Sequence, residues 1–569
     1  MLAFFIDYKL KSYEKKIKYA IDYVCSVCGF NYRYILKMSE LMPNDILLCY
    51  SLNEPTSEEL ARISVTGITF YIPANFILFD SKEFIKFVKG NPRNYLYEFR
   101  LDQKIPVFGE KRFKNPLNRY SLGDVFIGKF NFDFFGNIFF NLNLLEERLI
   151  GEKKDAQGKY PDSSYLLGDY TDYPYINALI KLFENFIEEG ISVSGQYLLK
   201  KEVWPEKEEF AVAVMHSLKS YRKWEGLSIF TAFGKDILKL FSSKYKMAFK
   251  NIIEEFKYAF NNDEPYWNFG EMFSIEEEYN INTSYFFKTD FDKSGDKDLY
   301  ELVNYLKEND HEIGLLASEK SMKDELHKTE CERLEQKTDV EIKGVRQVNN
   351  FFDREYTVQN HGKADFLYDA SLGFSEKSGF KGGIAYPFNF YNFYPGRESK
   401  EDDIQQYKQL EIPVIFSDDH LRINEYEYCS YDDASILLRR YIGYIKKFNG
   451  LLTLDFNQEN FYDISYDRTL YSFALAKIKE NNTWVAPLNE IAEWWQKRKR
   501  VKSFATEEGI KIVFYDDIKS ITFSVKGIAE INSVKGASHF ISENKVTFTD
   551  VKKKQEAFII LDTPPEAVE

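Results

Sequence analysis

Short apolar segments alternate with amphipathic segments through the middle of the chain, and this alternation limits the folds open to it. The apolar segments have the length of buried strands, as in FAVAVMH (Phe210–His216), IPVIFS (Ile412–Ser417) and LLTLDF (Leu451–Phe456). Between them lie segments whose apolar residues recur at helical spacing, including residues 321–336 and 432–448. Sustained alternation of strand and helix is typical of parallel β-structure. The sequence therefore predicts an α/β barrel or an open parallel sheet.

The first 195 residues combine both kinds of segment. Apolar residues recur at helical spacing over residues 10–29 and again from Ile176 to Ile187, and a short buried strand is expected at residues 45–51. From Pro116 to Leu145 aromatic and polar residues alternate, with glycines between the runs, which favours antiparallel strands joined by turns. We therefore expect an N-terminal mixed α/β domain over residues 1–195.

The pattern changes again after Arg500. IKIVFY, ITFSVKG, KVTFTD and EAFIILD are period-two strands separated by turn residues. They predict a small C-terminal β-sandwich over residues 501–569, which follows the α/β barrel expected over residues 200–500. A basic cluster at residues 497–502 marks the junction, and we expect it to be a solvated linker.

Composition excludes several classes of protein. Lys and Arg number 75 against 89 Asp and Glu, a formal charge of −14, so non-specific nucleic-acid binding is not expected. Five Cys in 569 residues do not form a disulfide framework. There is no apolar run of about 18 residues or more, so no membrane span is expected. The N-terminus lacks the order of a signal peptide, and a cytoplasmic location is the expectation.

The segment from Trp204 to Trp495 resembles the polysaccharide deacetylase family, the NodB-type carbohydrate esterases, and most of all its longer bacterial members with an extra N-terminal domain. The matching stretches include WPEKEEFAVAVMHS, HEIGLLAS, GVRQ, LEIPVIFSD and LYDASLGFSEKSGFKGGIAYPFNFY. The last is the most specific, because it is long and rich in glycine and aromatic residues. The resemblance implies a deformed (β/α) barrel with its site in the loops at the carboxyl ends of the strands.

The resemblance also implies a catalytic apparatus: one divalent metal held by an Asp and two His, a second Asp as general base and a further His as general acid. Where the longer relatives read T-H-D-V-D, this chain reads Met215-His216-Ser217-Leu218-Lys219, so the base position is Ser217 and a metal position is Lys219. The remaining positions are also occupied by residues that cannot do the same chemistry, namely Leu316, Lys320, Val348 and Asn457.

These losses together predict a pseudoenzyme that binds a glycan, a glycan precursor or a partner protein in surface-polysaccharide metabolism. No cofactor is expected, and a divalent metal such as zinc is expected only if a hydrolytic site has been rebuilt. The residues that could bind a ligand are His216, Arg346, Asp418, Asp369 and Tyr386.

Each of these candidates also has a structural interpretation. His216 could be a satisfied polar residue at a strand end, Arg346 could pair with Asp418 or Asp369, and Tyr386 could pack in an aromatic scaffold. Lys219 and Lys320 could together hold an anion or point to solvent. Of the remaining histidines, His327 is expected at the surface, whereas His361, His420 and His539 are expected to be isolated.

Two other functions stay open. One is an active deacetylase with a rebuilt site that uses His216, Asp418, Glu312 or Asp369. The other is a structural or assembly subunit that contacts a protein partner through residues 501–569.

Overall fold

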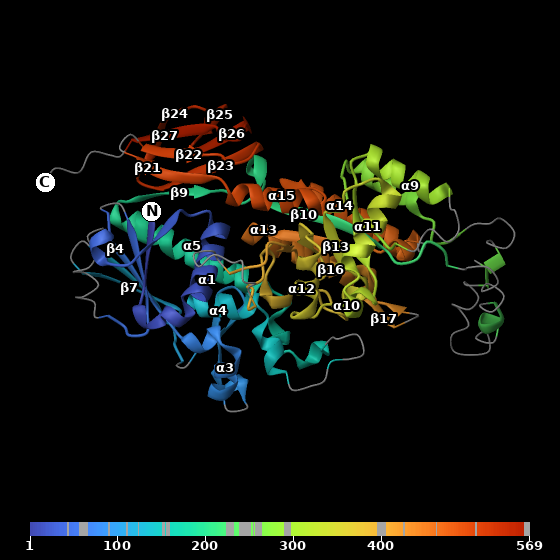
Figure 1. Cartoon of the computed structure of the whole chain (residues 1–569), viewed down its shortest axis with the longest axis horizontal. Coiled ribbons are helices and arrows are strands. Elements are labelled where there is room, and N and C mark those ends of the chain that lie inside the picture. The colour runs from blue at the N-terminus through green and yellow to red at the C-terminus, as the bar shows by residue number, and fades with distance from the viewer. Residues whose placement is uncertain are drawn as a thin grey trace.

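The computed structural model of the chain is shown in Figure 1. It describes residues 1–562 with the exception of 43–44, 56–66, 89–90, 110–111, 123–124, 151–153, 155–159, 224–232, 238–251, 254, 257–263, 290–296, 395–404, 425–426, 462–463 and 507–508. Three regions of sheet lie side by side, an N-terminal sheet, a central sheet and a C-terminal pair of sheets.

The central sheet has nine strands, and all of its pairings are parallel. Its order is β15-β14-β13-β12-β11-β10-β19-β16, with β20 also paired to β10. The bounds are β10 (Phe210–Leu218), β11 (Ser284–Phe287), β12 (Glu312–Ala317), β13 (Gly344–Gln347), β14 (Tyr368–Asp369), β15 (Leu410–Glu411), β16 (Phe416–Ser417), β19 (Leu451–Asp455) and β20 (Thr483–Val485). The α/β prediction for this region is confirmed as a curled parallel sheet.

Helices follow most of these strands, as the alternating pattern predicts. They are α8 (Phe269–Glu278), α9 (Lys297–Glu308), α10 (Ser321–Asp324), α11 (His327–Thr338), α12 (Tyr356–Lys363), α13 (Tyr431–Phe448), α14 (Thr469–Lys479) and α15 (Leu488–Lys499). A short antiparallel ribbon, β17 (Arg422–Asn424) and β18 (Glu427–Tyr428), lies apart from the main sheet.

Two local predictions in this region are wrong. Of the expected strand at Ile412–Ser417, only the last two residues form a strand, β16. The two-residue strand β15 ends just before this segment, at Glu411, and the two strands lie at opposite ends of the sheet order. Pro413 lies between them, and proline has no N–H to donate to a ladder. The expected helix at 321–336 is broken into α10 and α11, because Glu325 adopts a left-handed conformation with φ of 52°.

The N-terminal sheet has the order β2-β1-β3-β4-β8-β7, parallel except for the β7–β8 hairpin. Its strands are β1 (Leu2–Ile6), β2 (Tyr32–Ile35), β3 (Ile46–Ser51), β4 (Ile68–Pro73), β7 (Leu117–Leu122) and β8 (Val125–Phe130). The helices are α1 (Glu14–Cys28), α3 (Ser81–Val88), α4 (Phe134–Leu142) and α5 (Tyr175–Ser194), and a hairpin is formed by β5 (Leu96–Arg100) and β6 (Lys104–Phe108).

The prediction of strands from Pro116 to Leu145 is therefore correct for β7 and β8 and wrong for α4. All nine residues of α4 are buried, and its sequence carries no charged residue. Its two polar side chains, Asn137 and Asn141, form hydrogen bonds inside the protein. Asp133 begins it, since a side-chain oxygen of Asp133 accepts a hydrogen bond from the backbone N–H of Gly136 at 2.7 Å.

The C-terminal strands form two four-stranded antiparallel sheets, ordered β21-β22-β27-β24 and β25-β26-β23-β9. Their bounds are β21 (Lys502–Thr506), β22 (Gly509–Val513), β23 (Ile518–Gly527), β24 (Glu530–Lys535), β25 (His539–Ser542), β26 (Lys545–Val551), β27 (Glu556–Asp562) and β9 (Tyr197–Lys201). Strand β9 comes before the central sheet in the chain and pairs with β23. The segment that leads into the central sheet therefore completes a C-terminal sheet.

The basic cluster at 497–502 is only in part the solvated linker that the sequence predicts, because Arg500 and Lys502 are exposed whereas residues up to Lys499 belong to α15. Arg498 is 2 % exposed and donates hydrogen bonds to the carbonyl groups of Ser26, Lys201 and Glu202. The guanidinium thus joins α1, β9 and the end of α15. In the part of the chain that the structure describes, no helix is both long and apolar enough to cross a bilayer.

Candidate functional site

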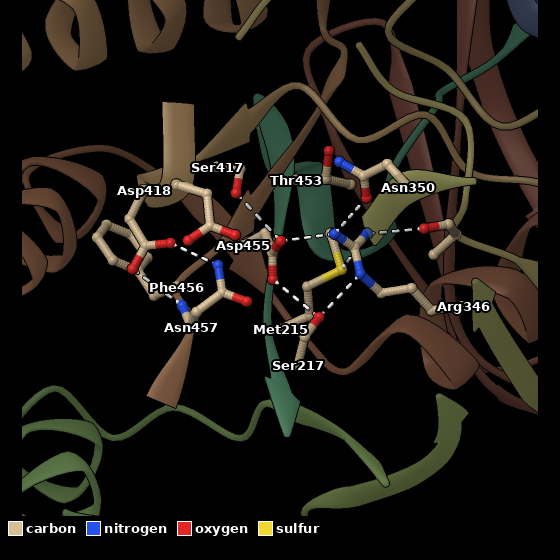
Figure 2. A network of polar contacts seen from close by, with 12 residues as sticks. Met215, Ser217, Arg346, Asn350, Ser417, Asp418, Thr453, Asp455, Phe456 and Asn457 are labelled. Carbon is tan, nitrogen blue, oxygen red and sulfur yellow. Dashed lines mark hydrogen bonds and ion pairs between the residues drawn. The ribbon is translucent and has the colours of Figure 1, made fainter. Parts of the chain in front are cut away.

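The carboxyl ends of parallel strands meet at one edge of the central sheet and bring polar side chains together there. Figure 2 shows this group, which includes Ser217 from β10, Arg346 from β13, Ser417 from β16 and Asp455 from β19. This is the edge at which ligands bind in parallel α/β folds. It is also the edge where the resemblance places the catalytic residues.

Arg346 lies at the centre of the group and is 3 % exposed. Its Nε donates a hydrogen bond to Ser217 Oγ at 2.9 Å, and its Nη1 donates to the carbonyl oxygen of Ala370 at 2.8 Å. Its Nη2 donates to Asn350 Oδ1 at 2.7 Å and forms an ion pair with Asp455 Oδ2 at 2.5 Å. The planar fork of the guanidinium is thus held by partners within the protein.

The partner of Arg346 differs from the predicted one. The sequence suggested Asp418 or Asp369, whereas the structure shows Asp455, which also accepts hydrogen bonds from Ser217 Oγ at 3.3 Å and Ser417 Oγ at 3.2 Å. Asp455 could have been recognised in the sequence as a candidate partner, because it is a carboxylate inside the apolar strand LLTLDF. A charge buried in such a strand requires a partner of opposite charge.

Asp418 and Asn457 form a second pair beside this group. The side-chain amide of Asn457 donates to Asp418 Oδ1 at 2.6 Å, and the backbone N–H of Asn457 donates to Asp418 Oδ2 at 2.9 Å. Burial, together with the neighbouring carboxylates of Asp419 and Asp455, raises the pKa of Asp418 well above its ordinary value. Neither side chain of this pair is exposed to solvent.

Lys219 forms an ion pair with Asp419, and Asn460 donates to the same carboxylate at 3.0 Å. Burial opposes the charge of the ammonium, but the carboxylate of Asp419 more than compensates and raises the pKa of Lys219. Lys320 is exposed. Of the two lysines considered as a joint anion site, one is therefore neutralised by the protein and the other lies at the surface.

His216 is completely buried. Its Nδ1 lies 2.7 Å from the carbonyl oxygen of Phe456 and its Nε2 lies 2.8 Å from a carboxylate oxygen of Glu276. The hydroxyls of Tyr285 and Tyr471 also donate to Glu276, at 3.1 Å and 2.9 Å. These contacts match the interpretation of His216 as a satisfied polar residue at a strand end, and Glu276 is the partner that sequence reasoning missed.

His327 and His361 are neither exposed nor isolated, contrary to the prediction. Their ring centroids are 4.4 Å apart, and both side chains are buried. His361 Nδ1 lies 2.6 Å from a carboxylate oxygen of Asp369, and His327 Nε2 lies 3.2 Å from Gln347 Oε1 and 3.1 Å from Ser321 Oγ. Burial, helped by His361, lowers the pKa of His327 to about 3. The segment 321–336 has a strongly polar sequence, which concealed the inward direction of His327.

The remaining candidates take part in packing. Leu316 and Val348 are buried, at 1 % and 5 % exposure. The ring of Tyr386 stacks on Trp495 with centroids 6.1 Å apart, and its hydroxyl donates to the carbonyl oxygen of Phe448. The carboxylate of Glu312 accepts from Ser284 Oγ and Tyr368 OH, both at 2.7 Å, and burial raises its pKa.

The side chains at this edge do not fit the divalent metal that the resemblance implies. Ser217 Oγ, at the base position, accepts a hydrogen bond from a guanidinium, and Lys219 brings an ammonium to a metal position. The other matching positions carry the buried alkyl groups of Leu316 and Val348 and the exposed ammonium of Lys320. Among the residues that the structure describes, no three or more His, Cys, Asp or Glu are grouped so as to hold a metal ion.

Residues 6–192 match the model of a family of unknown function, DUF7033. No curated protein matches the chain. A putative polysaccharide deacetylase from Mycobacterium smegmatis shares 16 % identity, over 52 % of this chain and 93 % of that one, with a TM-score of 0.36.

Two further solved structures are similar at lower identity. Agd3, described as a novel carbohydrate deacetylase, shares 7 % identity over 98 % of both chains, with a TM-score of 0.35. A mutant of a CE4 family pseudoenzyme with restored enzymatic activity shares 10 % identity, over 51 % of this chain and 70 % of that one, with a TM-score of 0.25. All three TM-scores are below 0.5, so these similarities do not define the activity of this chain.

Proposed function

We propose that the protein is a catalytically inactive relative of the carbohydrate deacetylases that binds a glycan, a glycan precursor or a partner protein. The contact between Arg346 and Ser217 carries the proposal. Removal of an acetyl group needs a base that accepts a proton from water. Here the side chain at the base position is the hydroxyl of Ser217, which accepts a hydrogen bond from the guanidinium of Arg346. The guanidinium itself cannot accept a proton.

Electrostatics at the former metal position support the same proposal. The ammonium of Lys219 and the guanidinium of Arg346 are both positively charged. They therefore repel a divalent metal cation at short range. The carboxylates of Asp419 and Asp455, which could attract an ion, are each paired with one of these cations. A metal would have to break both pairs to gain a ligand.

The experiment is a combined metal and turnover assay on the full chain. The protein is equilibrated with Zn²⁺ or Co²⁺, desalted, and analysed for metal by mass spectrometry, while acetate release is followed from N-acetylglucosamine oligomers and from acetylated xylan. We expect far less than one metal ion per chain and no acetate above the protein-free control. A stoichiometric metal, or acetate release that rises with protein concentration, would overturn the proposal.

One observation favours an active hydrolase with a rebuilt site as the second candidate. Asp369, His361 and His327 form a continuous chain of contacts, and a His held by a carboxylate is a common general base. Ser321 Oγ lies within 3.1 Å of His327 Nε2. This candidate predicts acetate release that Asp369→Asn reduces and that the exposed control Asp365→Asn leaves unchanged.

A further inference from the structure

A cleft of about 400 Å³ opens between the central sheet and the C-terminal sheets, away from the candidate site. Trp484 on β20 and Trp494 on α15 line one side, and Ser520 on β23 lines the other. Trp484 is the partner of Ala211 at the start of β10, whereas Ser217 lies near the end of that strand. The cleft is therefore at the amino-terminal edge of the parallel strands, opposite the Arg346 group.

The apolar wall of this cleft is rigid and aromatic. The rings of Trp484 and Trp494 meet edge to face with centroids 6.1 Å apart, and Trp204 packs behind Trp484 at 5.9 Å. Trp494 Nε1 donates a hydrogen bond to the carbonyl oxygen of Val203 at 2.9 Å, which fixes its orientation. Trp484 remains partly exposed. A partly exposed indole that packs against two other indoles is a suitable surface for the apolar face of a sugar ring or for a cation.

The polar wall carries more negative than positive charge. Five carboxyl groups line the cleft, those of Glu206, Glu208, Glu490, Glu493 and Asp517. Only two ammonium groups line it, those of Lys497 and Lys519. Lys497 pairs with Glu493 at 3.2 Å, and Lys519 pairs with Glu206 at 3.7 Å. Outside the cleft, Lys343 also contacts Glu493 and Lys552 lies 4.0 Å from Asp517. Among the described residues, Glu208 and Glu490 form no ion pair, so they are the carboxyl groups left to meet a ligand.

Two polar atoms at the cleft lack a hydrogen-bond partner among the described residues. One is Glu208 Oε2 and the other is Ser520 Oγ, which belongs to a side chain only 4 % exposed. A buried polar atom without a partner costs free energy, so a ligand that supplies donors here gains more than it would at a satisfied surface. Burial, together with Glu206, raises the pKa of Glu208 to about 7, and burial with Glu493 raises that of Glu490. A bound cation would reverse both effects.

We propose that this cleft binds a cationic amino sugar, the free-amine unit of a partly de-N-acetylated glycan. The ammonium group would pair with Glu208 and Glu490, the ring face would lie against Trp484, and a hydroxyl would donate to Ser520. An N-acetylated sugar lacks the charge and leaves the carboxyl groups unpaired, and an acidic sugar is repelled by them. The volume is within the range of small-ligand pockets.

The inference shares with the proposed function only the premise that the ligand is a glycan. It does not depend on whether the barrel is catalytic, because the cleft and the Arg346 group lie at opposite edges of the sheet. The two can therefore fail separately.

The test is isothermal titration of the full chain with glucosamine oligomers, N-acetylglucosamine oligomers and glucose oligomers of one length. We expect binding of the glucosamine oligomer alone, weakened by added salt. Glu208→Gln and Glu490→Gln keep the side-chain shape and are expected to weaken binding by roughly tenfold or more each, as for a lost charge-assisted hydrogen bond. Trp484→Ala is expected to weaken binding more than Trp484→Phe.

A control completes the design. Glu308→Gln changes an exposed carboxylate on α9 and is expected to leave binding unchanged. Equal affinity for the glucosamine and N-acetylglucosamine oligomers, or unchanged binding in folded Glu208→Gln and Glu490→Gln variants, would overturn the inference. Acetate release together with cleft-dependent binding would overturn the proposed function and leave the inference standing.

Discussion

Arg346 Nη2 and Asp455 Oδ2 lie 2.5 Å apart, and both side chains are almost completely buried at the carboxyl edge of the central sheet. Taking two charges out of water is costly, and their attraction repays that cost only when the remaining polar atoms are also satisfied. Ser217, Asn350 and the carbonyl group of Ala370 satisfy the guanidinium. The pair is thus fully satisfied within the protein at the carboxyl edge of the sheet.

Arg346→Met is expected to destabilise the protein by about 3–5 kcal/mol, because it leaves the Asp455 carboxylate buried without a counter-charge. The free energy of unfolding is measured by urea denaturation followed by tryptophan fluorescence. The double variant Arg346→Met with Asp455→Leu is expected to recover much of the loss, since both charges are then removed together. A single variant as stable as the parent would show that the pair does not hold the site together.

Lys219→Asp is expected to raise the affinity for divalent metal without creating activity. The substitution removes an ammonium and adds a carboxylate near Asp419, while the Arg346–Ser217 contact still prevents proton abstraction from water. Calorimetric titration with Zn²⁺ measures the affinity, and acetate release measures activity. Lys219→Met is the control, since it removes the positive charge without adding a ligand. Equal zinc affinity in the parent and the Asp variant would contradict this account.

The parallel sheet was predictable because apolar strands and amphipathic helices alternate over a long stretch of chain. The predictions of local structure failed where burial removes the alternation of polar and apolar residues on which they depend. Helix α4 is buried on all sides and so lacks the charged, exposed face that marks a surface helix. Arg498 belongs to a basic cluster in the sequence, although its guanidinium donates to carbonyl groups inside the protein.

The sequence predicted which residues lie at the candidate site but not which side chains they contact. Ser217, Arg346, Asp418 and Asn457 could be selected from motif spacing, and the structure places them at the carboxyl edge of the sheet. The pairing of Arg346 with Asp455 depends on which of several buried carboxylates the fold brings closest, which spacing along the chain does not specify.

The lowered pKa of His327 should make the free energy of unfolding depend on pH. Its pKa is about 3 in the folded protein against about 6.5 in an unfolded chain. Between these values the unfolded state binds the extra proton, so the contribution to stability is complete above about pH 6.5 and decreases as the pH falls toward 3. We expect the difference in the free energy of unfolding between the parent and His327→Gln to decrease on acidification. A difference that is constant from pH 7 to pH 4 would show that His327 titrates normally.

Asp133 should give the opposite dependence. Its carboxyl group is buried, and burial raises its pKa to about 7, although the backbone N–H groups of Gly136 and Asn75 and the hydroxyl of Tyr50 donate to it. Between about pH 4 and pH 7 the folded state binds the extra proton, so this contribution to stability falls as the pH rises and is constant above about 7.

The check is a comparison of the parent with Asp133→Asn, which resembles the neutral acid and can still begin α4. The free energy of unfolding of the parent relative to the variant is expected to fall by at most about 1.4 kcal/mol per pH unit over that window, the value for one proton. The measurement is urea denaturation at half-unit intervals from pH 4.5 to pH 8. A difference that rises with pH would mean that the hydrogen bonds to Asp133 outweigh its burial, and the carboxyl group would then be charged in the folded protein at neutral pH.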